Sequence, residues 1–149
     1  MMSNNKGLVF ALIISLFFFV SCSNKYCDKI IESIKNQCVN EEEECQVSFK
    51  EMFDLNWDTL YIFDSMLYPD EVSKALGTKY EGKIVPEGKS LFVLMYKGNI
   101  VREQKERCRD ITFVDMKKDG VVIIQRQNAY MVKQKILNDR EHYLLFKQE

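Results

Sequence analysis

The sequence predicts an α+β fold with an N-terminal helix, a short second helix and one mainly antiparallel sheet of about five to seven strands. Two observations predict this class. Apolar residues recur at helical spacing near the beginning of the chain and again over residues 69–77. From residue 90 onward, short apolar runs alternate with turn residues, which is typical of a sheet built from consecutive hairpins. We expect both helices to cover one face of this sheet.

The first helix is expected over residues 25–38, where apolar side chains recur every three or four positions. This spacing places them on one side of a helix and the charged residues on the other, so the helix should pack on the core. The apolar stripe consists of Cys27, Ile30, Ile31, Ile34 and Cys38. The consecutive glutamates at 41–44 repel one another, and we interpret them as a solvated segment after the helix.

The strand expected over residues 57–63 has apolar side chains on both faces, which favours a position in the middle of the sheet. We interpret its aromatic face as part of the core. The second helix is expected over residues 69–77, because Pro69 suits the first helical turn and Gly77 suits a left-handed C-terminal cap. The remaining strands are expected at residues 47–49, 90–96, 100–105, 111–116, 121–127, 130–137 and 142–146.

Tight turns separate most of the later strands. Turn residues occur at 97–99, 118–120 and 138–140, so the strands on either side of each turn should pair as antiparallel neighbours. The strand at 100–105 is the more polar member of its hairpin and is expected at a sheet edge. The strand at 121–127 is rich in β-branched residues and is expected to be buried.

The first residues of the chain have the pattern of a secretory signal. Lys6 is the sole charge before Cys22, and residues 8–20 form an apolar run that only Ser15 interrupts. A membrane-spanning helix needs about 20 apolar residues, so this run fits the hydrophobic region of a signal peptide better. Residues 19–21, Phe-Val-Ser, stand directly before Cys22 in the order large apolar, β-branched, small.

This pattern resembles the signal of bacterial lipoproteins, in which the lipobox ends at the cysteine that receives the lipid. The resemblance implies that residues 1–21 are removed and that Cys22 carries acyl chains, including palmitate, which anchor the domain formed by residues 22–149. Ser23 implies the outer membrane, with the domain facing the periplasm. The alternative is an ordinary cleaved signal, in which Cys22 has no role.

The four cysteines that follow Cys22 indicate two disulfides that staple a single exported domain. These cysteines are Cys27, Cys38, Cys45 and Cys108. In a helix, Cys27 and Cys38 would lie about 16 Å apart along the axis, whereas disulfide Cα atoms lie within about 7 Å. Two pairings remain open: Cys38–Cys45 with Cys27–Cys108, or Cys38–Cys108 with Cys27–Cys45. The cysteines lack C-x-x-C spacing, so we expect no metal site.

A second resemblance covers the middle of the chain. Asp-Leu-Asn-Trp-Asp at 54–58 is followed by Tyr-Ile-Phe at 61–63 and by a short helix ending in Ala-Leu-Gly at 75–77. This order resembles a group of small uncharacterised exported bacterial proteins, in which an apolar strand and a glycine-containing turn come next. The resemblance spans residues 47–105. It supports the α+β fold predicted above and implies no activity.

The sequence contains no recognisable catalytic or cofactor motif, so we predict that the protein is not an enzyme and uses no cofactor. His142 is the single histidine and is interpreted as a surface or edge residue. Asp58 and Asp64 lie about 20 Å apart along an extended strand, too far to act as a pair. The net charge of −1 at pH 7 gives no indication of nucleic-acid binding.

Location and architecture therefore carry the functional prediction. We expect a lipid-anchored envelope protein with a non-catalytic binding role, such as an immunity or inhibitor protein against a secreted toxin. The alternative is a structural or assembly lipoprotein of the cell envelope. The expected partners are the membrane, through lipid on Cys22, and a protein that the sequence does not identify.

Overall fold

The computed structural model describes residues 25–39 and 44–148. Within these residues the chain combines helices with a larger number of strands, which confirms the predicted α+β class. The helices are α2 (Tyr26–Gln37) and α3 (Pro69–Leu76). The strands are β1 (Glu44–Ser48), β2 (Thr59–Phe63), β3 (Ser90–Tyr96), β4 (Asn99–Glu106), β5 (Ile111–Val114), β6 (Lys117–Lys118), β7 (Val121–Gln125), β8 (Ala129–Leu137) and β9 (Arg140–Lys147).

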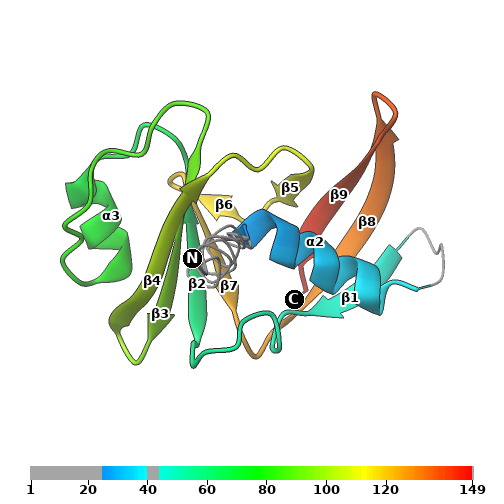
Figure 1. The fold of residues 1–149 in the computed structure, drawn as a ribbon, viewed down its shortest axis with the longest axis horizontal. Coiled ribbons are helices and arrows are strands. Elements are labelled where there is room, and N and C mark those ends of the chain that lie inside the picture. Colours follow the sequence, from blue (N-terminus) through cyan, green and yellow to red (C-terminus); the bar gives the residue numbers. More distant parts are fainter. Residues whose placement is uncertain (1–24, 40–43, 149) are drawn as a thin grey trace, which may run out of the picture.

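The strands form two sheets, which corrects the expectation of a single sheet. The five-stranded sheet has the order β4-β3-β2-β7-β6, and the four-stranded sheet has the order β1-β8-β9-β5. Neighbouring strands are antiparallel except β5 and β9, which are parallel. The β8–β9 hairpin has an apolar face of its own, and it buries that face against the first sheet instead of extending it (Figure 1).

The main core contains residues from both sheets and from α2. β2 is the middle strand of the five-stranded sheet, as its sequence predicts. Leu60 and Ile62 of β2 enter the main core, whereas Phe63 on the opposite face enters a second core beneath α3. Trp57, just before the strand, is buried in the main core. Both faces of β2 are covered, which explains why both are apolar.

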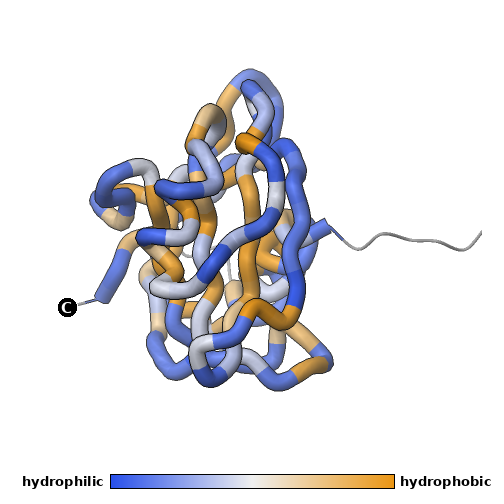
Figure 2. The backbone as a smooth tube through the Cα atoms, turned by 90° about the vertical axis from the view of Figure 1, so that its left-hand side faces the viewer, coloured by the Kyte–Doolittle hydropathy of each residue, from blue (hydrophilic) through white to orange (hydrophobic). Residues whose placement is uncertain are grey.

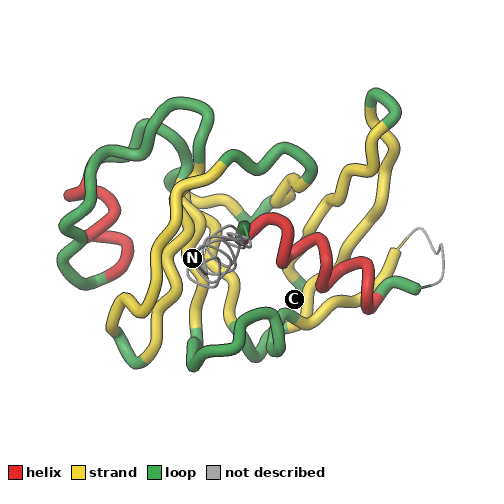
Figure 3. The backbone as a smooth tube through the Cα atoms, in the orientation of Figure 1, coloured by secondary structure: helices red, strands yellow, loops and turns green. Residues whose placement is uncertain are grey.

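The two helices cover opposite faces of the five-stranded sheet, although we expected both on one face (Figure 3). Ile30 and Ile34 of α2 lie in the main core, and Val72 and Leu76 of α3 lie in the second core. The physical reason is the alternation in β3, where successive side chains are buried on the two faces. Each apolar face must be covered, so one layer of helices is not enough.

The polar strand β4 lies at an edge of the five-stranded sheet, as predicted. The strand predicted at 121–127 ends earlier, at Gln125, and only one of its faces is buried. Val122 and Ile124 are buried, whereas Ile123 on the other face is 46% exposed because α3 does not extend over it. In Figure 2 the strands are largely hydrophobic and the connecting loops largely hydrophilic, as this pattern of burial requires.

Candidate binding surface

Two disulfides attach α2 to the rest of the domain. Cys27 is bonded to Cys108 and Cys38 to Cys45, with Cα–Cα distances of 5.8 and 5.9 Å. This confirms one of the two pairings that the sequence left open. Both pairings need the helix to end between Cys38 and Cys45; α2 ends one residue earlier, at Gln37, with Cys38 as its C-cap. The helix is therefore fixed at both ends, which makes it a rigid support for the sheet beneath it.

Glu106 caps the first turn of α2 from a distant part of the chain. Its Oε1 atom accepts a hydrogen bond from the backbone N–H of Cys27 at 2.7 Å. Among the described residues it is the only charged side chain that is buried, with 5% exposed. Burial raises the pKa of this carboxyl, and the hydrogen bond from Cys27 opposes that effect. Sequence reasoning missed this role, because the contact joins residues 79 positions apart.

The β8–β9 hairpin extends beyond the sheets, as Figure 1 shows. We call residues 134–142 the hairpin arm. Leu137 pairs with Arg140 across a two-residue turn formed by Asn138 and Asp139, with φ values of 51° and 59°. Asn and Asp tolerate this left-handed backbone, and such a turn matches the twist of the flanking strands. The turn holds two apolar side chains at the tip in water: Ile136 is 73% exposed and Leu137 50%.

The base of the hairpin arm is held from both sides. The Glu141 carboxylate forms an ion pair with Lys35 of α2 at 3.0 Å and accepts a hydrogen bond from the Tyr143 hydroxyl at 2.9 Å. His142 Nε2 lies 2.8 Å from Thr112 Oγ1 on β5. The hydrogen bond from Lys35 lowers the pKa of Glu141, and burial together with the bond to Glu141 raises the pKa of Tyr143 to about 12. These contacts fix the direction of the arm.

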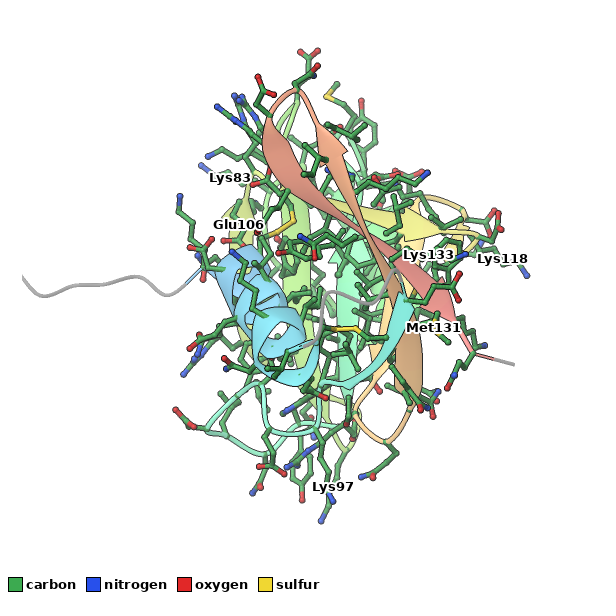
Figure 4. The ribbon with its side chains drawn as sticks, turned by 90° about the vertical axis from the view of Figure 1, so that its right-hand side faces the viewer. Lys83, Lys97, Glu106, Lys118, Met131 and Lys133 are labelled. Carbon is green, nitrogen blue, oxygen red and sulfur yellow. A yellow bond between two sulfur atoms is a disulfide. The ribbon has the colours of Figure 1, made fainter. Side chains whose placement is uncertain are left out.

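The outer face of the four-stranded sheet continues the apolar surface of the arm. The register of β8 and β9 places alternate residues on this face, opposite the buried residues Tyr130, Val132, Tyr143 and Leu145. From β8 and β9, the outer face carries Met131, Lys133, Lys135, Leu137, Arg140, His142, Leu144 and Phe146. Figure 4 shows Met131 and Lys133 on the side of the sheet away from α2. Lys133 lies 5.5 Å from the centre of the Phe146 ring, so apolar and cationic groups are mixed here.

The other candidate residues from the sequence do not form a common site: these are Asp58, Asp64 and His142. Asp58 accepts a hydrogen bond from the Lys97 backbone N–H at 2.7 Å, at the β3–β4 turn. Asp64 forms an ion pair with Lys117 at 2.6 Å, at the opposite end of β2. That ion pair borders a cavity of about 280 Å³, which is also lined by Thr112. His142 bonds to Thr112 rather than to either aspartate. These contacts position turns and strands.

Part of the predicted site lies outside the described residues. Cys22, with its proposed lipid, is one such residue, and so are the glutamates at 41–43. Glu44, the last of that run, begins β1 and forms an ion pair with Lys133. Within residues 25–39 and 44–148, no helix has the length and apolar character needed to cross a bilayer. In the same residues, no three His, Cys, Asp or Glu side chains are grouped as metal ligands.

Sequence reasoning located the strands of the arm but not their exposure. The sequence did contain a signal of this exposure, namely the polar residues in the strands on either side of the turn. A strand pair inside a core would need apolar residues there. Comparison of the chain with protein-family models, with curated proteins and with solved structures gave no match.

Proposed function

We propose that the protein is a lipid-anchored inhibitor of the bacterial envelope, an immunity protein that binds a secreted toxin through the hairpin arm and the outer face. The observation that carries the proposal is an arm with a fixed base whose tip exposes an apolar side chain on each face, Leu137 on the outer face and Ile136 on the opposite one. Isolated exposed apolar residues are common, but a rigid arm that exposes apolar side chains at its tip, next to a half-apolar sheet face, is typical of an interface.

Rigidity supports a binding role in a second way. Association costs free energy because side chains and loops lose freedom, and a surface that is already ordered loses less. The turn at Asn138 and Asp139, the ion pair from Lys35 and the contact with Thr112 all order the arm before any partner arrives. Location supports the same role, because the signal that precedes Cys22 would place the domain where toxins enter the cell.

The test is protection of living cells. A strain that lacks the gene is grown in contact with its toxin-producing parent, and survival is compared after complementation with wild type or with Ile136→Asp/Leu137→Asp. We expect wild type to restore survival and the double variant to lower survival at least tenfold, because a charge in an apolar contact weakens binding. Val101→Asp is the matched control, because Val101 is also exposed, at 42%, but lies on β4.

Two outcomes would contradict the proposal. If the deletion strain is weakened in the absence of attackers, with leakage or detergent sensitivity, the protein is an assembly lipoprotein instead. If Ile136→Asp/Leu137→Asp protects as well as wild type while remaining folded, the arm is not the contact surface. Mass spectrometry of the protein extracted from membranes tests the anchor separately: we expect an N-terminal Cys22 carrying acyl chains, and an unmodified Cys22 would remove the anchor from the proposal.

A further inference from the structure

Cationic side chains gather around the point where the described chain begins. They come from three segments: the residue before α2, the loop between α3 and β3, and the end of β4 with the residues after it. The basic cluster consists of Lys25, Lys83, Lys89, Lys105, Arg107 and Arg109. All are exposed except Lys105, which is half-buried.

Specific contacts bring the three segments together. The Cys27–Cys108 disulfide places Lys25 beside the chain that carries Arg107 and Arg109. The ammonium of Lys105 donates a hydrogen bond to the backbone carbonyl of Lys83 at 3.1 Å. The Arg107 guanidinium lies next to Gly88, where a Cβ would stand 3.7 Å from Nη2. Figure 4 shows Lys83 and Glu106 on the same side of the molecule, with Lys118 on the opposite side.

The positive charge of this cluster is only partly compensated: Glu87 borders the same pocket as Arg107 and Arg109, and no ion pair is formed there among the described residues. In residues 25–39 and 44–148, the ion pairs use Lys35, Lys79, Lys117 and Lys133, none of which belongs to the cluster. Glu106, which lies among these residues, is buried against α2 and has a raised pKa. The six cations still outnumber the carboxylates in and beside these segments, Asp28, Glu87, Glu106 and Asp110, so an excess of positive charge remains, which favours an anionic partner.

We propose that the basic cluster rests on the anionic lipid headgroups of the membrane that carries the protein, and so fixes the orientation of the domain. This inference rests on the proposed lipid anchor at Cys22. Three peptide units join Cys22 to Lys25 and span about 10 Å at most. The Debye length at physiological ionic strength is about 8 Å, so an anchored domain keeps Lys25 within reach of the surface charge. Each Lys or Arg near an anionic surface adds to the attraction.

The experiment uses the lipidated protein added to preformed phosphatidylcholine vesicles, with and without phosphatidylglycerol. Flotation shows whether the protein is anchored, and a water-soluble amine reagent followed by mass spectrometry reports the reactivity of each lysine. We expect phosphatidylglycerol to reduce labelling of Lys25, Lys83, Lys89 and Lys105 several-fold, and to leave Lys118 unchanged. Raising the salt concentration should remove the protection, because the interaction is between exposed charges.

Charge reversal provides the matched comparison. Arg107→Glu/Arg109→Glu should float equally well but lose the protection of Lys25, whereas Lys118→Glu/Lys147→Glu, on other strands, should retain it. If the first variant fails to form both disulfides, Lys83→Glu/Lys89→Glu replaces it, with Lys25 as the reporter. Protein that floats with both vesicles but shows no difference in labelling overturns the docking surface alone. Protein that floats with neither overturns the anchor as well.

Discussion

At the scale of single residues, Glu106 is the side chain whose environment departs most from its usual one. A carboxyl group is rarely buried without compensation, since desolvation disfavours its charged form. Here the N–H groups at the beginning of α2 compensate in part, because the positive end of a helix favours an acceptor. Removing the acceptor by Glu106→Ala should cost about 1–3 kcal/mol, because a buried donor would lose its partner.

The raised pKa of Glu106 predicts a pH dependence. The folded state holds the proton more tightly than the unfolded chain, in which glutamate titrates near pH 4.3. The contribution of Glu106 to stability is therefore full below about pH 4 and is lost as the pH rises through the raised pKa of the folded state. Glu106→Gln does not titrate, so the free energy of unfolding of wild type minus that of the variant should fall with rising pH.

Urea denaturation at a series of pH values measures this difference. Glu103→Gln on the same strand is the matched control for the loss of one carboxylate, because Glu103 is exposed. A difference between wild type and Glu106→Gln that increases with pH would contradict the assignment.

At the scale of elements, α2 is held by covalent and hydrogen-bonded attachments at both ends. The Gln37 amide donates to the Ser48 carbonyl at 2.7 Å and accepts from the Ser48 N–H at 2.9 Å, so the helix end joins β1 directly. The adjacent disulfide, Cys38–Cys45, closes a short loop with a sequence separation of 7, whereas Cys27–Cys108 has a separation of 81.

The two disulfides should therefore differ in their contribution to stability. In the chain-entropy model a cross-link stabilises by restricting the unfolded chain, and the effect grows with loop length. We expect Cys27→Ala/Cys108→Ala to lower the free energy of unfolding by about 4–5 kcal/mol and Cys38→Ala/Cys45→Ala by about 2–3 kcal/mol. Urea unfolding of the two double variants measures both values. Each variant replaces both cysteines of one disulfide, so no thiol from that disulfide remains free. The reverse order would show that contacts around the short loop dominate.

The end of α3 gives a prediction that depends on the backbone alone. Gly77 has a φ of 67°, and a Cβ placed there would meet no atom within 4 Å. Gly77→Ala should therefore destabilise the protein by about 1 kcal/mol through the left-handed conformation and not through a clash. Thermal denaturation checks this value, and a loss of several kcal/mol would show that the loop after α3 needs Gly77 for another reason.

At the scale of the whole molecule, stability is concentrated in two cores, while the candidate binding surface lies outside them. The main core joins both sheets to α2, and the second core lies between the five-stranded sheet and α3. The hairpin arm contributes no buried residue beyond its base, so it can change without loss of the fold. In the proposed function, binding and stability would therefore be carried by different side chains, as in other interfaces on rigid scaffolds.

This separation predicts effects of very different size for two similar truncations. Leu94 is fully buried in the main core, so Leu94→Ala should lower the free energy of unfolding by about 2–5 kcal/mol. Ile136 is 73% exposed, so Ile136→Ala should change it by less than about 0.5 kcal/mol. Denaturant unfolding compares the two. A large loss for Ile136→Ala would mean that the tip of the arm packs against the domain in solution.

The sequence by itself determined most of the secondary structure of this protein, because those signals act over a few residues; it missed the two-residue strand β6 and the early start of β1 at Glu44. Helical spacing identified α2, Pro69 and Gly77 delimited α3, and the bounds of β3 were predicted to the residue. The position of Cys22 and the even number of cysteines after it also follow from the sequence alone, and they led to the prediction of two disulfides and to the proposal of a lipid anchor.

Only the tertiary structure decided how these elements combine. The division into two sheets, the parallel pairing of β5 with β9 and the choice between two disulfide pairings depend on contacts between distant segments. Glu106 meets α2 for the same reason, and the exposure of Ile136 depends on where the neighbouring strands end. Local patterns indicate that a face is apolar. The packing of the whole chain decides which element covers that face and which apolar face remains exposed.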